Sequence, residues 1–201
     1  SGIVLTSRFG AFKVNKRYKR GKVAFNVDET SLTSANLCVK KRVFEKIGGF
    51  NISLFPGEDP EFIYRAREEG FLVAYNPDMV IFHKRRTDFA SYCKQIFKYG
   101  LARPKRNKAV SNTKMFFLIP MLFLLYFILL PILTLMDILL ILPMALYLFL
   151  SVIFAVYDSS KNGSFLSLLI LPFLYLFTHL SYGLGMLIGY IKNEKNNYPA
   201  K

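Results

Sequence analysis

The sequence predicts an α/β unit followed by an all-α transmembrane region, and two observations support this fold class. Up to Lys114 the chain mixes short apolar runs with Gly, Pro and charged residues, as a soluble unit does. From residue 115 to residue 191, Leu, Ile, Phe, Met and Tyr dominate, in runs longer than the roughly 18 residues that mark a membrane-spanning helix. We therefore expect a membrane protein.

The soluble part is expected to alternate short strands with helices. Residues 3–5 fit the end of a strand or of a helix. Apolar runs bounded by turn residues predict strands at 23–27, 37–39, 71–75 and 79–82. Residues 40–47 predict a short amphipathic helix, and Gly48-Gly49 is expected to end it because glycine takes the left-handed conformation without a Cβ penalty.

The run Glu58-Asp59-Pro60-Glu61 is typical of a helix start. Asp59 is expected at the N-cap, Pro60 at the first helical position and Glu61 near the positive end of the helix dipole. A carboxylate at such a junction has two interpretations. It either caps the helix and does no more, or it takes a proton from an incoming hydroxyl as a general base.

Residues 87–114 are expected to form an interfacial amphipathic helix and a basic linker. Apolar side chains recur at helical spacing over 87–101 beside Lys94 and Lys98, a pattern typical of a helix lying on a bilayer. A core helix carries the same stripe, and that alternative stays open.

Spanning helices are predicted at 115–136, 138–157 and 165–191, with a polar tail at 192–201. Three crossings fit these lengths. They would place Lys192, Lys195 and Lys201 on the outer side, against the usual distribution of basic residues. Two crossings plus a re-entrant or interfacial segment would avoid this conflict, so both topologies remain open.

The formal charge of +14 is concentrated beside the first predicted span. The basic residues between the acidic motif and that span include Lys84, Arg85, Arg86, Lys94, Lys98, Arg103, Lys105, Arg106, Lys108 and Lys114. Such residues mark the cytoplasmic side of a span and attract anionic lipid. No nucleic-acid module accompanies them, so membrane lipids are the expected partner and nucleic acid is not. Cys38 and Cys93 lack the spacing of a zinc site or a disulfide framework.

The order of motifs over residues 35–103 resembles the family 2 glycosyltransferases of bacterial membranes, which include exopolysaccharide synthases. The motifs that carry the resemblance are Ser34-Ala35-Asn36, Lys40-Lys41-Arg42, Gly48-Gly49-Phe50, Glu58-Asp59, Arg65, Gly70, Pro77 and His83. The resemblance implies that residues 1–86 are the C-terminal part of a GT-A type catalytic domain. It also implies a multi-pass, hexosyltransferase-type enzyme of the bacterial inner (cell) membrane, with its catalytic part in the cytoplasm.

The same resemblance implies a role for individual residues. Asp59 matches the base that deprotonates the acceptor hydroxyl in an inverting displacement, and Glu58 matches its acidic neighbour. Gln95, Lys98 and Tyr99 align with a Gln-x-x-Arg-Trp motif that lines the site of the acceptor and the donor diphosphate. Lysine in place of arginine keeps the charge but loses the bidentate fork that fits a diphosphate, which puts processive synthesis in question.

Three further residues are expected near the same ligands. Asn36 is expected to contact the donor or acceptor. Arg103 is expected to reach either the diphosphate or a lipid headgroup. His83 is expected to be either a metal ligand or diphosphate contact, or a surface group without such a role.

The resemblance implies a nucleotide-sugar donor, a lipid-linked or glycan acceptor, and a divalent metal (Mg or Mn). In the family an Asp-x-Asp motif of an upstream nucleotide-binding half holds the metal, and this sequence contains no Asp-x-Asp. The main metal site is therefore expected outside this chain, which would be a C-terminal fragment. The alternative is a non-catalytic membrane-anchored protein that binds anionic lipid or a partner subunit, in which Asp59 only caps a helix.

The isolated 201-residue chain is expected to be inactive, because it lacks the motif that holds the donor's metal in the family. Hydrolysis and transfer of nucleotide-sugar donors by the purified chain measure this. Clear turnover would contradict the expectation.

Overall fold

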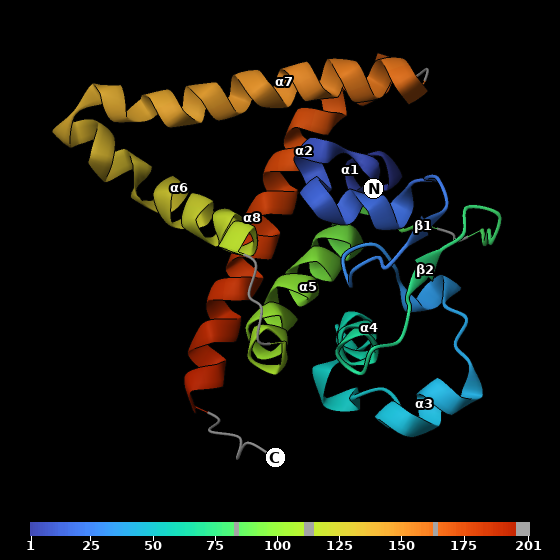
Figure 1. Ribbon diagram of the computed structural model, residues 1–201. Helices are drawn as coiled ribbons and strands as arrows, with labels where there is room; N and C mark the ends of the chain where they lie inside the picture. The colour runs from blue at the N-terminus through green and yellow to red at the C-terminus, as the bar shows by residue number, and fades with distance from the viewer. Residues whose placement is uncertain (83–84, 111–114, 163–164, 196–201) are drawn as a thin grey trace.

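The structure, a computed structural model, describes residues 1–82, 85–110, 115–162 and 165–195 (Figure 1). The α-helices are α1 (Gly2–Thr6), α2 (Arg8–Ala11), α3 (Lys41–Ile47), α4 (Glu58–Glu68), α5 (Phe89–Ala109), α6 (Ile119–Met136), α7 (Leu142–Asn162) and α8 (Phe165–Lys195). The 3-10 helices are η1 (Phe12–Tyr18), η2 (Ser34–Asn36), η3 (Ile52–Leu54), η4 (Met115–Leu118) and η5 (Ile138–Ile141). Two strands, β1 (Ala24–Phe25) and β2 (Ala74–Tyr75), pair antiparallel, with Ala24 opposite Tyr75.

The prediction of an α/β, GT-A type unit is wrong. The described residues hold two strands of two residues each, and residues 3–5 lie in α1. The expected strands at 37–39 and 79–82 form no ladder, because no neighbouring strand offers partners for their backbone groups. A ribbon as short as β1–β2 cannot organise a sheet. The soluble part is held together by helices.

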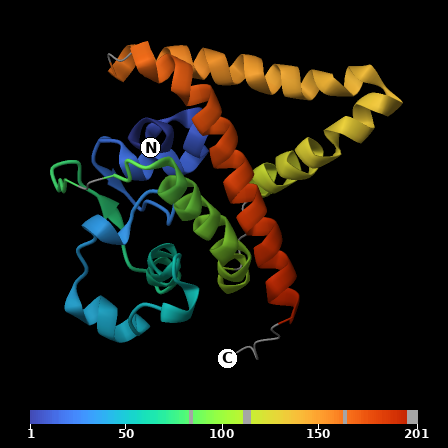
Figure 2. The same cartoon turned by 180° about the vertical axis from the view of Figure 1, so that it is seen from behind.

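Helices α5 and α8 lie side by side in both views and make the most extensive contact in the chain (Figures 1 and 2). Glycines bring their backbones together. A Cβ added to Gly100 of α5 would meet the backbone of Tyr182, and one added to Gly185 of α8 would meet the backbone of Phe97. Small residues at such positions let helices approach closely.

One hydrophobic core joins the N-terminal helices to the apolar helices. It contains Val4 and Leu5 of α1, Tyr92 and Ile96 of α5, Ala155 of α7, and Leu171 and Tyr175 of α8. The shared core means that α5 packs between the soluble part and the membrane part.

Polar contacts reinforce this core. Tyr92 and Thr178 share a hydroxyl hydrogen bond of 2.8 Å. The Nε2 atom of His179 lies 3.1 Å from the carbonyl oxygen of Phe9, and its Nδ1 atom lies 2.9 Å from the hydroxyl of Tyr147. Because a carbonyl oxygen can only accept, Nε2 is the donor, and in neutral histidine Nδ1 then accepts from Tyr147. His179 thereby connects α2, α7 and α8.

Among the residues that the structure describes, three helical segments are long and apolar enough to cross a membrane: Met115–Met136, Ile138–Lys161 and Phe165–Lys192. The first two form a V whose tip points away from the rest of the molecule (Figure 1). Asp137 lies at that tip, where its carboxylate accepts a hydrogen bond of 2.9 Å from the N–H of Leu139. Most apolar side chains of α6 and α7 are exposed, as expected of helices that a bilayer surrounds.

Replacing Gly185→Val should separate α5 from α8, because the new side chain meets backbone rather than a movable side chain. Overpacking of this kind costs about 1–3 kcal/mol. Thermal unfolding in detergent should show a lower Tm. The control, Leu184→Ala on the exposed side of the same helix, should leave the Tm unchanged. An unchanged Tm for Gly185→Val would contradict the close contact.

Candidate active site

The acidic motif lies in the first turn of α4, but Asp59 does not cap the helix as predicted. The N-cap is Gly57, with a φ of 154° that favours glycine, and α4 begins at Glu58. Glu58 folds back, and its Oε2 accepts a hydrogen bond of 2.8 Å from the N–H of Gly57. Asp59 is therefore free to bond a distant segment, while the positive end of the helix dipole still favours its charge.

The carboxylate of Asp59 is held by backbone from 25 residues upstream in the chain. Its Oδ2 accepts a hydrogen bond of 3.0 Å from the N–H of Ser34 in η2. The residue is buried, with 8 % of its surface exposed. Its Oδ1 takes no hydrogen bond from the described residues, so this oxygen can accept a proton. One oxygen positions the group and the other can react.

Tyr18 of η1 lies within the electrostatic influence of Asp59 and of Tyr99 on α5. Burial raises the pKa of Tyr18, and nearby Tyr99 and Asp59 raise it further, whereas Arg17 and Arg85 lower it. The guanidinium of Arg85 lies 4.7 Å from the centre of the Tyr18 ring. The carboxylate, Tyr99 and the two arginines thus all act on the phenol of Tyr18.

Glu29 fastens the segment that carries Tyr18 to α4. Its backbone carbonyl accepts a hydrogen bond from Arg17, and its carboxylate lies 3.9 Å from Nη1 of Arg67 on α4. Glu29 is itself buried, which strengthens both contacts relative to surface ion pairs. η1 and α4 are therefore connected through one acidic residue.

The predicted site residues of α5 lie in three different surroundings: a hydrogen-bond network, the solvent-exposed surface and the protein interior. Gln95 donates a hydrogen bond of 2.8 Å to the hydroxyl of Tyr99 and accepts one of 3.1 Å from Arg86, so these three side chains form one network. Lys98 is exposed. Arg103 is buried instead, where it donates to the hydroxyl of Tyr182 at 2.8 Å. Burial lowers the pKa of Arg103.

The side chain of Arg103 serves the packing of the chain. Its guanidinium carbon lies 3.3 Å from the centre of the Phe117 ring in η4, in a cation–π contact. A guanidinium covered in this way faces neither solvent nor a lipid headgroup. The structure therefore separates Arg103 from the other predicted ligand-binding residues.

Asn36 also makes a structural contact. Its Nδ2 donates a hydrogen bond of 2.6 Å to the carbonyl oxygen of Met79, which joins η2 to the segment after β2. The same 3-10 helix supplies the N–H of Ser34 to Asp59, so Asn36 helps to position the acidic site. His83 lies outside the described residues.

Arg65 of α4 explains the Gly-Gly-Phe motif. Its guanidinium donates to the carbonyl oxygens of Ile47, Gly48 and Gly49, at 2.9 Å for Gly48 and 2.7 Å for Gly49. It also bonds both carboxylate oxygens of Glu61, at 2.6 and 3.0 Å. A planar guanidinium suits this bidentate geometry. Arg65 therefore fixes the end of α3 against the helix that carries Asp59.

An aromatic cluster supports the same junction. The rings of Phe44 on α3 and Phe50 after it pack on Phe62 of α4, with centroid distances of 5.7 and 4.7 Å. Phe62 is almost fully buried. The phenylalanine of the motif thus packs against α4 as well as against the helix that precedes it.

Sequence reasoning missed Tyr18, Arg85 and the N–H of Ser34. Residues 13–22 form a basic run without an apolar stripe, and Tyr18 is its one aromatic side chain. Tyr18 packs against the core that α1, α5 and α8 share, and such contacts between segments far apart in the sequence are not encoded in a local pattern. Arg85 was noticed only as one of many basic residues.

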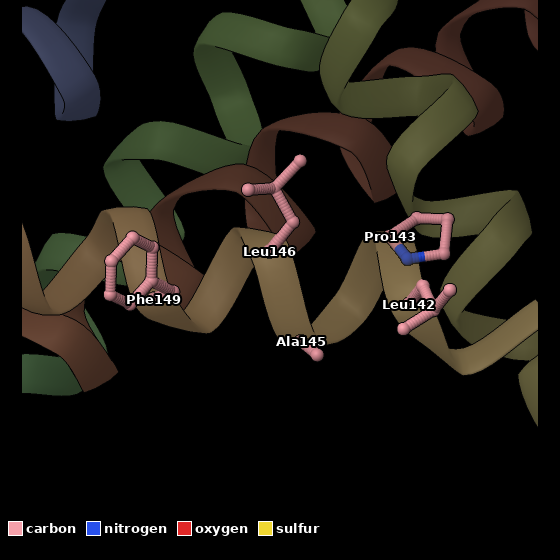
Figure 3. A pocket seen from close by; sticks show the side chains of 5 residues that line it. All are labelled: Leu142, Pro143, Ala145, Leu146 and Phe149. Carbon is pink, nitrogen blue, oxygen red and sulfur yellow. The ribbon is translucent and has the colours of Figure 1, made fainter. Parts of the chain in front are cut away.

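Neither a metal centre nor a polar pocket lies at this site in the described part of the chain. No three His, Cys, Asp or Glu side chains gather there, so the divalent ion that the resemblance implies has no set of ligands among these residues. A hollow on α7 is lined by Leu142, Pro143, Ala145, Leu146 and Phe149 (Figure 3). Its walls are apolar, and α1 and α2 lie between α7 and α4 (Figure 1).

The family model described as glycosyl transferase family group 2 matches residues 6–188 of the chain. No curated protein and no solved structure matches the chain. The matched region includes α4, α5 and all of η2, which together hold the acidic site. The match confirms the resemblance that the motifs carried, at the level of the family.

Replacing Arg65→Met should destabilise the junction of α3 and α4, because it leaves the largely buried Glu61 carboxylate and three carbonyl groups unpaired. Breaking one partner of a buried ion pair costs about 3–5 kcal/mol, and part of that is expected here because Arg65 is partly exposed. Thermal or urea unfolding measures the loss. Arg42→Met, an exposed arginine on α3, is the matched control. Equal stability of the two variants would contradict the role of Arg65.

Proposed function

The chain belongs to glycosyl transferase family group 2, and on this premise we propose that it moves a sugar from a nucleotide-sugar donor to a lipid-linked or polysaccharide acceptor at a membrane. Three helices that can cross a bilayer support attachment to the membrane. The resemblance of the motifs over residues 35–103 supports the finer proposal of a polysaccharide-synthesising enzyme of the bacterial cell membrane.

The geometry of Asp59 is the observation that carries this proposal. The carboxylate is buried, it is fixed through Oδ2 by the N–H of Ser34, and its Oδ1 can accept a proton. A group that only caps a helix would bond the N–H groups of its own first turn. Asp59 instead bonds a separate segment, which positions it as a general base requires.

The proposed reaction is an inverting displacement. Oδ1 of Asp59 takes the proton of the acceptor hydroxyl while the hydroxyl oxygen forms a bond to the anomeric carbon of the sugar. The bond from that carbon to the diphosphate oxygen breaks on the opposite face, and the nucleoside diphosphate leaves with the electron pair. The products are the glycosylated acceptor, a nucleoside diphosphate and a proton held on Asp59.

Cationic and hydroxyl groups near Asp59 are proposed to receive the diphosphate. The leaving group gains negative charge in the transition state, which positioned cations stabilise. Arg85 contacts Tyr18, while Arg86 is connected to Tyr99 through Gln95. Lys98 lies one residue before Tyr99 and is exposed to ligands from solution. Glu58, held on the N–H of Gly57, keeps the loop before α4 in place.

The reacting part is proposed to lie on the cytoplasmic side. The basic residues that precede the first candidate span, among them Lys105, Arg106 and Lys108, match the usual bias of cytoplasmic segments. Nucleotide sugars are anionic and would meet this positively charged face.

Replacing Asp59→Asn in the complete enzyme should lower kcat for transfer by about 10²–10⁴-fold, the range that a general base contributes. The amide oxygen of Asn can still accept from the N–H of Ser34, so the local fold and donor binding should persist. Transfer of radiolabelled sugar in membranes and equilibrium binding of the donor measure the two effects.

Asp78→Asn is the control, because Asp78 is exposed and pairs with Arg20 on the surface. It should leave both transfer and donor binding unchanged. Wild-type transfer by Asp59→Asn would refute the base assignment, and the chain would then be better described as a lipid- or partner-binding subunit.

A further inference from the structure

The loop before α4, residues 51–57, presents two large apolar side chains to its surroundings. Ile52 is 86 % exposed and Phe55 is 75 % exposed, although Leu54 of the same loop is buried. Single exposed apolar residues are common on soluble proteins and need no explanation. Here two of them lie on one loop, close to the helix that precedes the first candidate membrane span. This indicates a surface that another molecule covers.

The exposure of these side chains is fixed by the structure of the loop. Leu54 between them is buried, which turns Ile52 and Phe55 outward. The N–H of Phe55 donates to the carbonyl oxygen of Ile52 at 3.2 Å, and Asn51 accepts from both the N–H and the hydroxyl of Ser53, at 3.2 and 2.7 Å. The 51–57 loop is thus a closed turn that presents its apolar side chains.

The 51–57 loop is attached to the basic end of α5. Lys105 donates a hydrogen bond of 2.6 Å to the carbonyl oxygen of Ser53. The side chain of Arg106 passes beside Gly57, since a Cβ built there would lie 3.5 Å from Cδ of Arg106. Lys108 follows on the exposed side of the same helix. Lys105 and Arg106 therefore lie beside the loop that carries the two apolar side chains, and Lys108 adds a third cation at the same end of α5.

The first candidate membrane span follows directly after this basic end. α5 ends at Ala109, and the span begins at Met115. The chain therefore approaches the bilayer at the place where the 51–57 loop is fastened. Apolar tips flanked by basic residues match the two layers of a membrane interface, acyl chains below and anionic headgroups above.

We propose that the 51–57 loop is a membrane anchor that inserts Ile52 and Phe55 into the boundary between headgroups and acyl chains of an anionic bilayer. Asp59 follows Phe55 by four positions, so the anchor holds the acidic site at the bilayer surface. This consequence rests on the proposed function, because it brings the base to an acceptor that resides in the membrane. The insertion itself does not depend on sugar transfer.

The absence of tryptophan from the sequence allows a direct measurement. Phe55→Trp and, separately, Ile52→Trp each introduce a single fluorophore into the full chain. Phe25→Trp is the matched control, because Phe25 is 70 % exposed and lies on β1, on the side of the molecule away from α6 (Figures 1 and 2). Each variant is reconstituted in phosphatidylglycerol-rich vesicles with or without dibrominated acyl chains.

Tryptophan at 55 or 52 should be quenched by brominated lipid at least about twofold more than tryptophan at 25, and acrylamide in the water should show the reverse order. Replacing phosphatidylglycerol by phosphatidylcholine should lower the lipid quenching at 55, because the flanking cations lose their partners. Tryptophan at 25 should not respond to this exchange.

Three results would overturn the proposal. Equal acrylamide quenching at 55 and 25 would mean that the loop remains in water. Protection at 55 from both quenchers would mean that a second copy of the chain or another protein covers it. Equal lipid quenching at 55 in phosphatidylglycerol and phosphatidylcholine vesicles would exclude an anionic bilayer as the specific partner. None of these readouts involves transfer, so they are independent of the test of Asp59.

Discussion

The close contact of α5 with α8 is the interaction on which the rest of the structure depends. Gly100 and Gly185 bring the two backbones together, and the Tyr92–Thr178 hydrogen bond closes the contact beside the core. α5 also interacts with the soluble part. Lys105 donates a hydrogen bond to the 51–57 loop, and Tyr99 lies close enough to Tyr18 to raise its pKa. The position of the acidic site relative to the membrane helices therefore follows from one helix pair.

The acidic site shows how backbone groups position a reactive side chain without a sheet. α4 supplies the helix dipole, η2 supplies the N–H of Ser34, and Arg65 fastens the end of α3 to α4. Each contact joins segments that are distant in the sequence. Their combined effect is to limit Asp59 to one orientation, in which one oxygen is occupied and the other can take a proton.

Much of the helical structure could be predicted from the sequence, since its signals are local. Apolar spacing, terminal glycines and long apolar runs predicted α3, α4, α5 and the three candidate spans. Of the four predicted strands, those at 23–27 and 71–75 contain the two-residue strands β1 and β2, whereas those at 37–39 and 79–82 form no ladder. Residues 79–82 have the apolar character of a strand, but a strand also needs a neighbour, and the described chain offers none.

The site was predicted in part, for the same reason. The pattern around Glu58 and Asp59 identified the acidic pair and the helix that follows it. It could not reveal that Asp59 bonds Ser34 rather than its own helix turn, nor that Arg103 is covered by Phe117. Those outcomes depend on tertiary packing. The resemblance gave the family, which the match over residues 6–188 confirmed, but not the fold of the described residues.

The most direct test of the central claim is a chemical cross-link between α5 and α8. The rings of Phe89 and Phe177 lie 5.1 Å apart, so thiols introduced by Phe89→Cys and Phe177→Cys, after Cys38→Ser and Cys93→Ser, lie within reach of a short bifunctional thiol reagent. In membranes that hold the complete enzyme, the reagent should cross-link the pair and the cross-linked protein should keep wild-type transfer, because these helices act as one fixed unit. Failure to cross-link, or loss of transfer on cross-linking, would contradict this account.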